Sequence, residues 1–164
     1  MRFSRKPSAV RRALKSVKRP GTAVVETAVV LPVYVLLLLA IIEFGHAQLV
    51  ISLLQSGCRN GARLGAMQGP TTAQVIARVN QSLGSAFDAS KASVFVRDAN
   101  VFDTGTAPTT DVAIESMPAI ELGSAEPRRL FVVRASVPYN SIALLPMPFL
   151  KNVTLDAQSF MRHE

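Results

Sequence analysis

The chain of 164 residues has one cysteine, two histidines and no tryptophan. Because Cys58 is the only cysteine, the monomer can form no internal disulfide, and its position in a helical stretch predicts a small packed residue. One cysteine and two histidines also cannot supply the ligand spacing of a zinc or iron–sulfur site. We therefore expect neither a metal site nor any other cofactor.

The few histidines are also poorly placed for catalysis. His46 lies at the predicted end of an apolar helix and His163 is the penultimate residue, so neither suits a histidine-based triad. Three aspartates, Asp98, Asp103 and Asp111, fall in or near predicted loops. Their spacing fits no calcium loop, and loop aspartates commonly form turns. The sequence therefore disfavours a signal-anchored periplasmic enzyme, and we expect no enzymatic activity.

Acidic residues are absent from the chain before Glu26. The eight basic residues of this leader are Arg2, Arg5, Lys6, Arg11, Arg12, Lys15, Lys18 and Arg19. The rest of the chain has 10 basic and 11 acidic residues, so the net charge of +7 describes the leader and not a basic domain. A basic tail can bind nucleic acid, but basic residues directly before an apolar run mark the cytoplasmic side of a membrane helix. We expect no nucleic-acid partner.

An uninterrupted apolar run follows the leader. Ala28–Ile42 would span about 22 Å as a helix, which is short of the roughly 30 Å hydrocarbon core of a bilayer. The longer stretch Val24–Phe44 reaches that length and includes Glu26 and Glu43 near its ends, where a carboxylate costs less than at the bilayer centre. Glu43 and His46 are then expected at the outer membrane interface. The sequence predicts a single-pass protein in contact with membrane lipid.

Helical spacing continues beyond the apolar run, and one long helix is predicted from about Thr22 to Gln68. A cleaved secretory signal is disfavoured because no typical cleavage site and loop follow the run. Gly57, Gly61 and Gly65 recur every four residues on one face of the helix. Each helical glycine costs up to about 1 kcal/mol, so the row predicts that another element packs closely there. The alternative is a flexible exit from the membrane.

The remainder of the chain predicts a small domain. Gly69 and Pro70 end the long helix, and Thr71 and Gln74 have the spacing of a capping box at the start of a short second helix, which Gly84 ends.

Alternating apolar residues predict strands at Ala92–Arg97, Leu130–Tyr139 and Val153–Met161. Residues 104–126 are expected to be mostly loop, with room for an edge strand at Asp111–Glu115. The predicted fold class is α+β, with two helices and a three- to four-stranded antiparallel sheet. We expect a leader (1–21), a membrane and extended helix (22–69) and a periplasmic domain (70–164).

The most informative spacing joins Gly21 to Glu26, which follows it by five residues inside the apolar helix. This arrangement resembles the N-terminus of type IV prepilins, in which cleavage after Gly21 would leave Thr22 as the first residue. An intramembrane carboxylate is costly unless it is paired, and cleavage creates an α-amine that is largely cationic at neutral pH. Glu26 of one subunit could therefore pair with the amine of a neighbour and fix their axial register. The alternative is that Glu26 only marks the inner headgroup boundary.

Two further stretches narrow the resemblance. The chain is similar to the TadE-like family over Val25–Gly45 and Arg59–Arg63. Members of this family are minor pilins (pseudopilins) of the tight-adherence, or Flp, pilus system. Leu155–Arg162 resembles the closing strand of that family, whereas residues 70–126 have no residue-by-residue counterpart. Thr27 stands where a phenylalanine or tyrosine often follows the glutamate.

The resemblance implies a non-enzymatic role in pilus assembly. The chain would be inserted in the bacterial inner membrane, trimmed by a prepilin peptidase after Gly21, and associated with other pilins and the assembly platform. Its C-terminal domain would project into the periplasm. Entry into the filament, capping it and priming it are all compatible with the resemblance. An uncleaved, membrane-tethered adaptor or adhesin is the alternative function.

Overall fold

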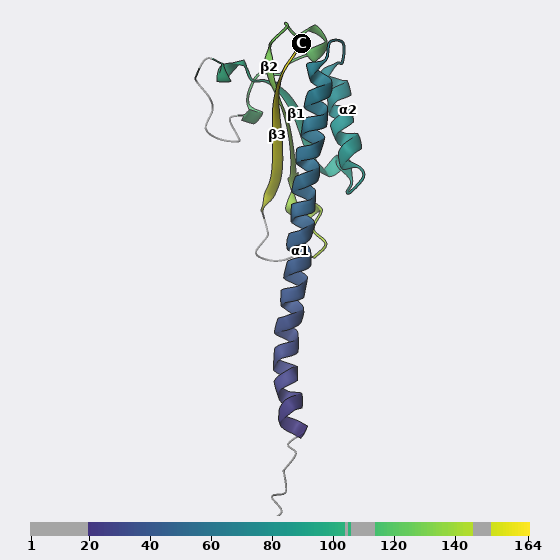
Figure 1. The fold of residues 1–164 in the computed structure, drawn as a ribbon, viewed down its shortest axis with the longest axis vertical. Helices are drawn as coiled ribbons and strands as arrows, with labels where there is room; N and C mark the ends of the chain where they lie inside the picture. Colours follow the sequence, from purple (N-terminus) through teal and green to yellow (C-terminus); the bar gives the residue numbers. More distant parts are fainter. Residues whose placement is uncertain (1–19, 104, 106–113, 146–151) are drawn as a thin grey trace, which may run out of the picture. The chain divides into compact units, whose positions relative to one another are not determined.

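A computed structural model describes residues 20–103, 105, 114–145 and 152–164. The basic leader lies outside these described residues. Helix α1 runs from Pro20 to Ala66 over 47 residues, which confirms the predicted long helix to within two residues at each end. The chain divides into two compact units, with the boundary between Leu38 and Leu39, and α1 contributes to both (Figure 1).

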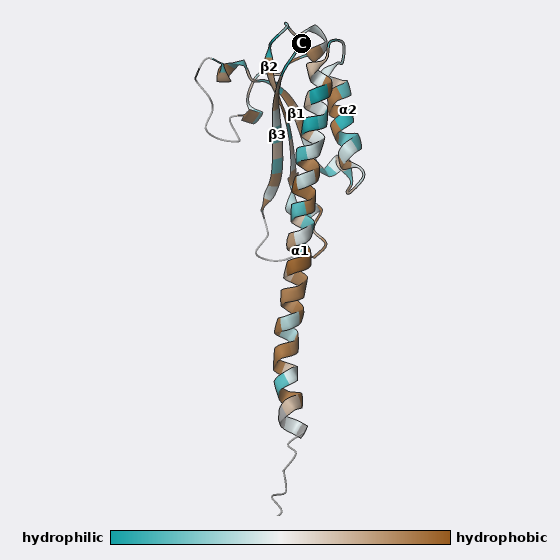
Figure 2. Ribbon diagram, viewed as in Figure 1, coloured by the Kyte–Doolittle hydropathy of each residue, from teal (hydrophilic) through white to brown (hydrophobic). Residues whose placement is uncertain are grey.

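The first unit, within the described residues, is the apolar N-terminal part of α1. Its large hydrophobic side chains are exposed, from Val24 at 69% to Leu38 at 40%, and Figure 2 shows this part of the helix as predominantly hydrophobic. By length and composition α1 could cross a membrane, and among the described residues it is the single helix of this kind. No other described residue of this unit covers these side chains.

The second unit combines the remainder of α1 with a short helix and a sheet. Helix α2 spans Thr72–Leu83, as predicted. The predicted capping box is confirmed, because the Gln74 N–H donates to Thr71 Oγ1 at 3.3 Å and the Thr71 N–H donates to Gln74 Oε1 at 2.9 Å.

Three strands form an antiparallel sheet in the order β1-β2-β3. They are β1 (Ser93–Asp98), β2 (Leu130–Pro138) and β3 (Thr154–Arg162), and they confirm the three predicted strands and the α+β class. Of the expected edge strand, residues 111–113 lie outside the described residues. Ile114 and Glu115 are helical, so the prediction of an edge strand is wrong for these two residues.

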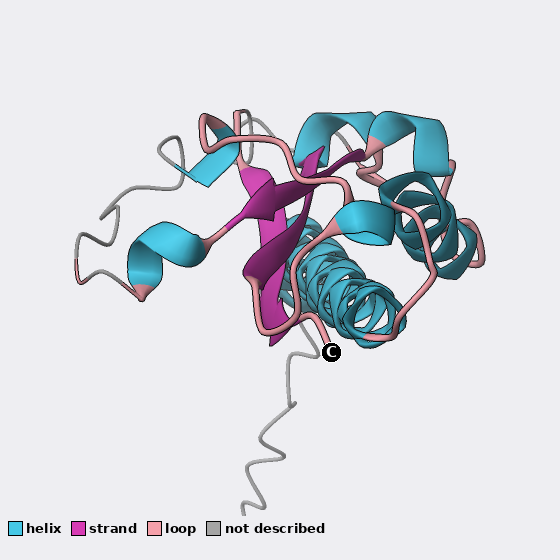
Figure 3. Ribbon diagram, turned by 90° about the horizontal axis from the view of Figure 1, so that it is seen from above, coloured by secondary structure: helices cyan, strands magenta, loops and turns pink. Residues whose placement is uncertain are grey.

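One face of the sheet packs on both helices (Figure 3). The apolar residues of β2 predicted to share a face, Phe131 to Val137 at every second position, are fully buried against α1 side chains such as Leu54. Cys58 is also fully buried, as expected, and its Sγ donates to the Ala157 carbonyl of β3 at 3.3 Å. The first and last elements of the chain therefore share one core.

The opposite face of β2, on which alternation along the strand places Arg134, is also covered. Val132 is fully buried and Arg134 is 4% exposed, because the segment after β1 folds over them with Ile114 and Met117 in a second apolar cluster. The Arg134 guanidinium lies 3.3 Å from the Asp156 carboxylate. The described part of residues 104–126 is thus a cover for the sheet as well as a connection.

The C-terminal residues complete the end of α1. The Glu164 N–H donates to the Ala66 carbonyl at 2.8 Å, and the buried His163 ring has Nδ1 3.0 Å from the Gly65 carbonyl. These contacts satisfy carbonyls that a helix C-terminus otherwise leaves without a partner.

Candidate functional site on helix α1

The expected processing residues lie in the first turn of α1, which begins at Pro20. Gly21 is exposed, and among the described residues no side chain lies within 4 Å of the position that a Cβ would take there. Thr22 follows within the same turn. Because α1 rises about 1.5 Å per residue, the backbone of Thr22 lies about 6 Å along the axis from that of Glu26. The structure therefore brings the two processing residues and Glu26 within little more than one helical turn.

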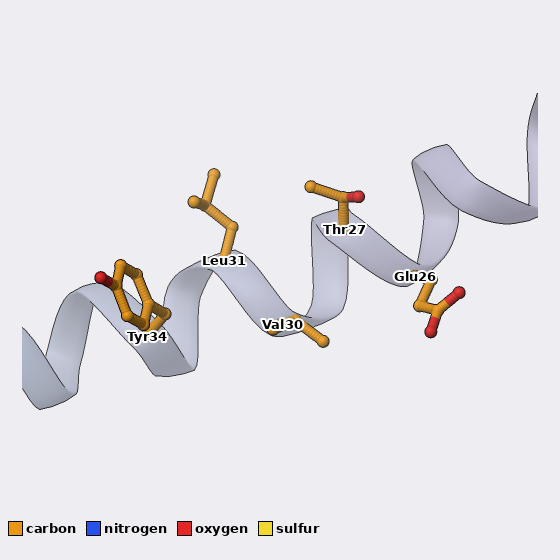
Figure 4. A pocket seen from close by; sticks show the side chains of 5 residues that line it. All are labelled: Glu26, Thr27, Val30, Leu31 and Tyr34. Atoms are coloured by element: carbon orange, nitrogen blue, oxygen red, sulfur yellow. The ribbon is translucent and has the colours of Figure 1, made fainter.

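Glu26 projects from the exposed apolar part of α1. Figure 4 shows it on the same side of the helix as Val30, while Thr27 and Leu31 point to another side. These four residues and Tyr34 line a shallow hollow on the surface of this single helix. Within the described residues no hydrogen bond or ion pair to the Glu26 carboxylate is present, whereas Thr27 Oγ1 donates to the Ala23 carbonyl at 2.9 Å. The carboxylate is therefore accessible to another chain.

The glycine row lies in the second unit and faces the chain's own α2 and sheet. A Cβ at Gly61 would be 2.5 Å from Val79 Cγ2, and one at Gly65 would be 2.7 Å from Leu122 Cδ1. At Gly57 the nearest atom, on Leu83, would be at an ordinary 3.5 Å. The close approach is thus tightest at Gly61 and Gly65, and the element packed against this face is internal to the domain.

We expect Gly61→Ala to destabilise the domain by up to about 2 kcal/mol. Overpacking against the rigid Val79 side chain costs about 1–3 kcal/mol, which exceeds the roughly 1 kcal/mol that alanine gains over glycine in a helix. The matched variant Gly57→Ala meets only ordinary contacts and should be neutral or up to about 1 kcal/mol more stable. Denaturant unfolding of the detergent-solubilised protein checks both variants. Equal stability of the two would contradict the packing role of Gly61.

Glu43, which was expected at the outer membrane interface, has contacts within the domain that its sequence position did not predict. Its side chain is buried in the second unit, with 1% of the residue exposed. The carboxylate accepts a short hydrogen bond from Tyr139 Oη, and its Oε2 accepts the Leu145 N–H at 3.2 Å. Tyr139 Oη also lies 3.2 Å from the Glu43 carbonyl. This part of α1 is therefore joined to the residues that follow β2.

Burial and the adjacent Glu43 carboxylate both raise the pKa of Tyr139 well above its usual range. The phenol is therefore protonated at physiological pH and acts as the donor. His46, which was expected beside Glu43 at the interface, is half-buried with its ring centroid 6.4 Å from that of Tyr139.

Sequence reasoning missed this hydrogen-bonded group. The sequence did single out Glu43, because no other acidic residue lies between Glu26 and Asp88. The partner could not be identified, because Tyr139 is 96 residues away along the chain.

The N-terminal part of the chain matches a family model, described as TadE-like protein, over residues 21–63. This match confirms the TadE-like resemblance. Searches among curated proteins and among solved structures found no match. The TadE-like segment begins at Gly21 and contains Glu26, Glu43 and Gly61. Together with the candidate membrane helix, it fits a membrane protein related to the Tad pilus.

Proposed function

We propose that this protein is a minor pilin-like (pseudopilin-like) subunit that acts in assembly of a tight-adherence, or Flp, pilus. A prepilin peptidase cleaves it after Gly21, and the subunit then associates with other pilins and the assembly platform. The observation that carries this proposal is the Gly21–Glu26 offset at the start of an exposed apolar helix, inside a TadE-like segment.

Glu26 supplies the directional contact of this assembly. In hydrocarbon, apolar helix faces attract one another with little dependence on axial register, whereas a carboxylate and an ammonium group are strongly favoured at contact distance. Cleavage after Gly21 creates such an ammonium group on Thr22. The Glu26 carboxylate of one subunit forms an ion pair with the α-amine of its neighbour. This pairing fixes the axial register of the two helices.

The distribution of charge sets the proposed orientation. The eight basic residues before Gly21 hold the N-terminus in the cytoplasm. The helix then crosses the inner membrane, and the second unit lies in the periplasm. The protein is held in the membrane until it is incorporated into a pilus or pseudopilus.

N-terminal sequencing of the membrane-extracted protein tests cleavage directly. In a strain with an active prepilin peptidase, we expect the mature chain to begin at Thr22. Gly21→Val should leave the leader attached, because a branched side chain replaces the hydrogen at the cleavage position. Gly45→Val is the matched control, since Gly45 is likewise free of neighbouring atoms within 4 Å. An intact N-terminus in the unchanged protein rejects the proposal and favours an uncleaved adaptor or adhesin.

A further inference from the structure

Beyond the buried Glu43, the helices of the second unit carry charge of one sign. Residues 44–87 contain three arginines and no acidic residue, whereas residues 88–164 contain nine acidic and seven basic residues. Arg59 and Arg63 of α1 and Arg78 of α2 are all exposed. Within the part of the chain that the structure describes, none of the three forms an ion pair. The two-helix layer thus presents unneutralised positive charge.

Two of these arginines lie on opposite sides of a groove. Arg63 from α1 and Arg78 from α2 line it together with Asn60, Leu64 and Met67. Arg78 donates to Gln81 Oε1 at 3.1 Å, which orients its side chain on α2. Met67 is 49% exposed, so an apolar surface lies beside the two cations. A guanidinium group binds carboxylates through paired hydrogen bonds, and the groove therefore suits an acidic protein surface.

The same chain has an acidic hollow formed by residues that follow α2 in the sequence. Asp98, Glu121, Glu126 and Arg129 line this hollow. Arg129 pairs with Asp98, and the pairing and the Asn100 N–H outweigh the effect of partial burial, so the pKa of Asp98 is below its usual range. The hollow therefore keeps a net negative charge at neutral pH, and the Glu126 side chain is 84% exposed.

We propose that the groove defined by Arg63 and Arg78 binds the acidic hollow of a second copy of this chain. The inference rests on the proposed function for its setting, in which parallel copies stand in one membrane. A groove that carries only positive charge repels its own counterpart, so a symmetric groove-to-groove contact is excluded. A groove-to-hollow contact that the second copy does not reciprocate is heterologous, and such a contact can be repeated from copy to copy along an assembly.

A lipid headgroup is a less suitable occupant. Glu43 is expected at the outer membrane interface, and Arg63 lies twenty residues beyond it in the continuous helix α1, a distance of about 30 Å along the axis. The apolar side chains of Leu64 and Met67 in the groove also favour a protein surface, which supplies carboxylates and apolar atoms together.

A charge exchange between two differently tagged full-length copies tests the contact. The copies are co-expressed, solubilised at low ionic strength and co-purified through one tag. Arg63→Glu with Arg78→Glu in both copies should lower recovery of the second tag about tenfold, because carboxylates then face carboxylates. Glu126→Arg in both copies should have a similar effect. Pairing a groove variant with a Glu126→Arg copy should restore most of the recovery. Arg59→Glu, outside the groove lining, is the matched control and should have a smaller effect.

The proposal would be overturned if the groove variant and the Glu126→Arg variant each lowered recovery of the second tag and the mixed pair did not restore it. Unchanged recovery with every variant would also overturn it. Flotation with phosphatidylglycerol vesicles provides a further arm. If the groove variants lose vesicle binding and keep full co-purification, the occupant is a lipid headgroup and the proposal is wrong. Restoration by charge exchange in a protein whose Gly21 is not cleaved would reject the proposed function and retain this contact.

Discussion

Glu26→Ala is expected to insert into the membrane normally and to lose incorporation into the pilus or pseudopilus. Removing one partner of a desolvated ion pair costs about 3–5 kcal/mol, and each 1.4 kcal/mol is a factor of about ten in an association constant. Incorporation should therefore fall about a hundredfold or more. Immunoblots of sheared pilus fractions, normalised to the membrane fraction, measure this loss.

Thr27→Ala is the control for the Glu26 experiment. Thr27 is adjacent to Glu26, but its hydroxyl donates within its own helix to Ala23, so its loss should leave incorporation unchanged. A periplasm-dependent reporter fused after Glu164 verifies insertion of every variant. Normal incorporation of Glu26→Ala would show that the carboxylate only marks the headgroup boundary.

Tyr139→Phe is expected to destabilise the second unit by about 1.5–3 kcal/mol, because it removes a hydrogen bond to a charged acceptor in a buried site. Glu43→Leu should cost about 3 kcal/mol, because both the tyrosine hydroxyl and the Leu145 N–H lose their carboxylate acceptor. The double variant should be less destabilised than the sum by about 1–3 kcal/mol, since the shared hydrogen bond is lost only once.

Amide hydrogen exchange of β2 in the detergent-solubilised protein measures these free energies without relying on tyrosine fluorescence. Tyr34→Phe is the matched control, because Tyr34 is 54% exposed in the first unit and its hydroxyl plays no part in the domain. Strictly additive effects of Tyr139→Phe and Glu43→Leu would indicate that the two side chains do not interact.

The sequence predicted the features that depend on neighbours along the chain. The Thr71–Gln74 capping box and the alternation through β2 are local patterns, and both occur as expected. The glycine row indicated close packing, but the sequence could not show that α2 and Phe131 would lie against it. The spacing of glycines specifies a face of a helix, and it carries no information on which element covers that face.

The missed features depend on residues far apart in the chain. The hydrogen bond between Glu43 and Tyr139 could be found only from the folded chain. Arg134 and Val132 lie on the second face of β2, and Ile114 and Met117, which are distant along the chain, cover that face. Alternation along a strand shows which residues share a face, and it cannot show that a later or earlier segment buries the second face as well.

The contact between Cys58 and Ala157 spans 99 residues and sets an order of events during synthesis. Helix α1 leaves the ribosome first, but its packing surface for the sheet is completed only by β3, the last strand. The residues after Ala66 number 98, and at about 5–20 residues per second their translation takes roughly 5–20 s. Until β3 has been made, Val50, Leu54 and Cys58 have only an incomplete sheet to bury them, so a nascent chain exposes part of this apolar stripe. A chain that lacks β3 therefore cannot complete the core around Cys58.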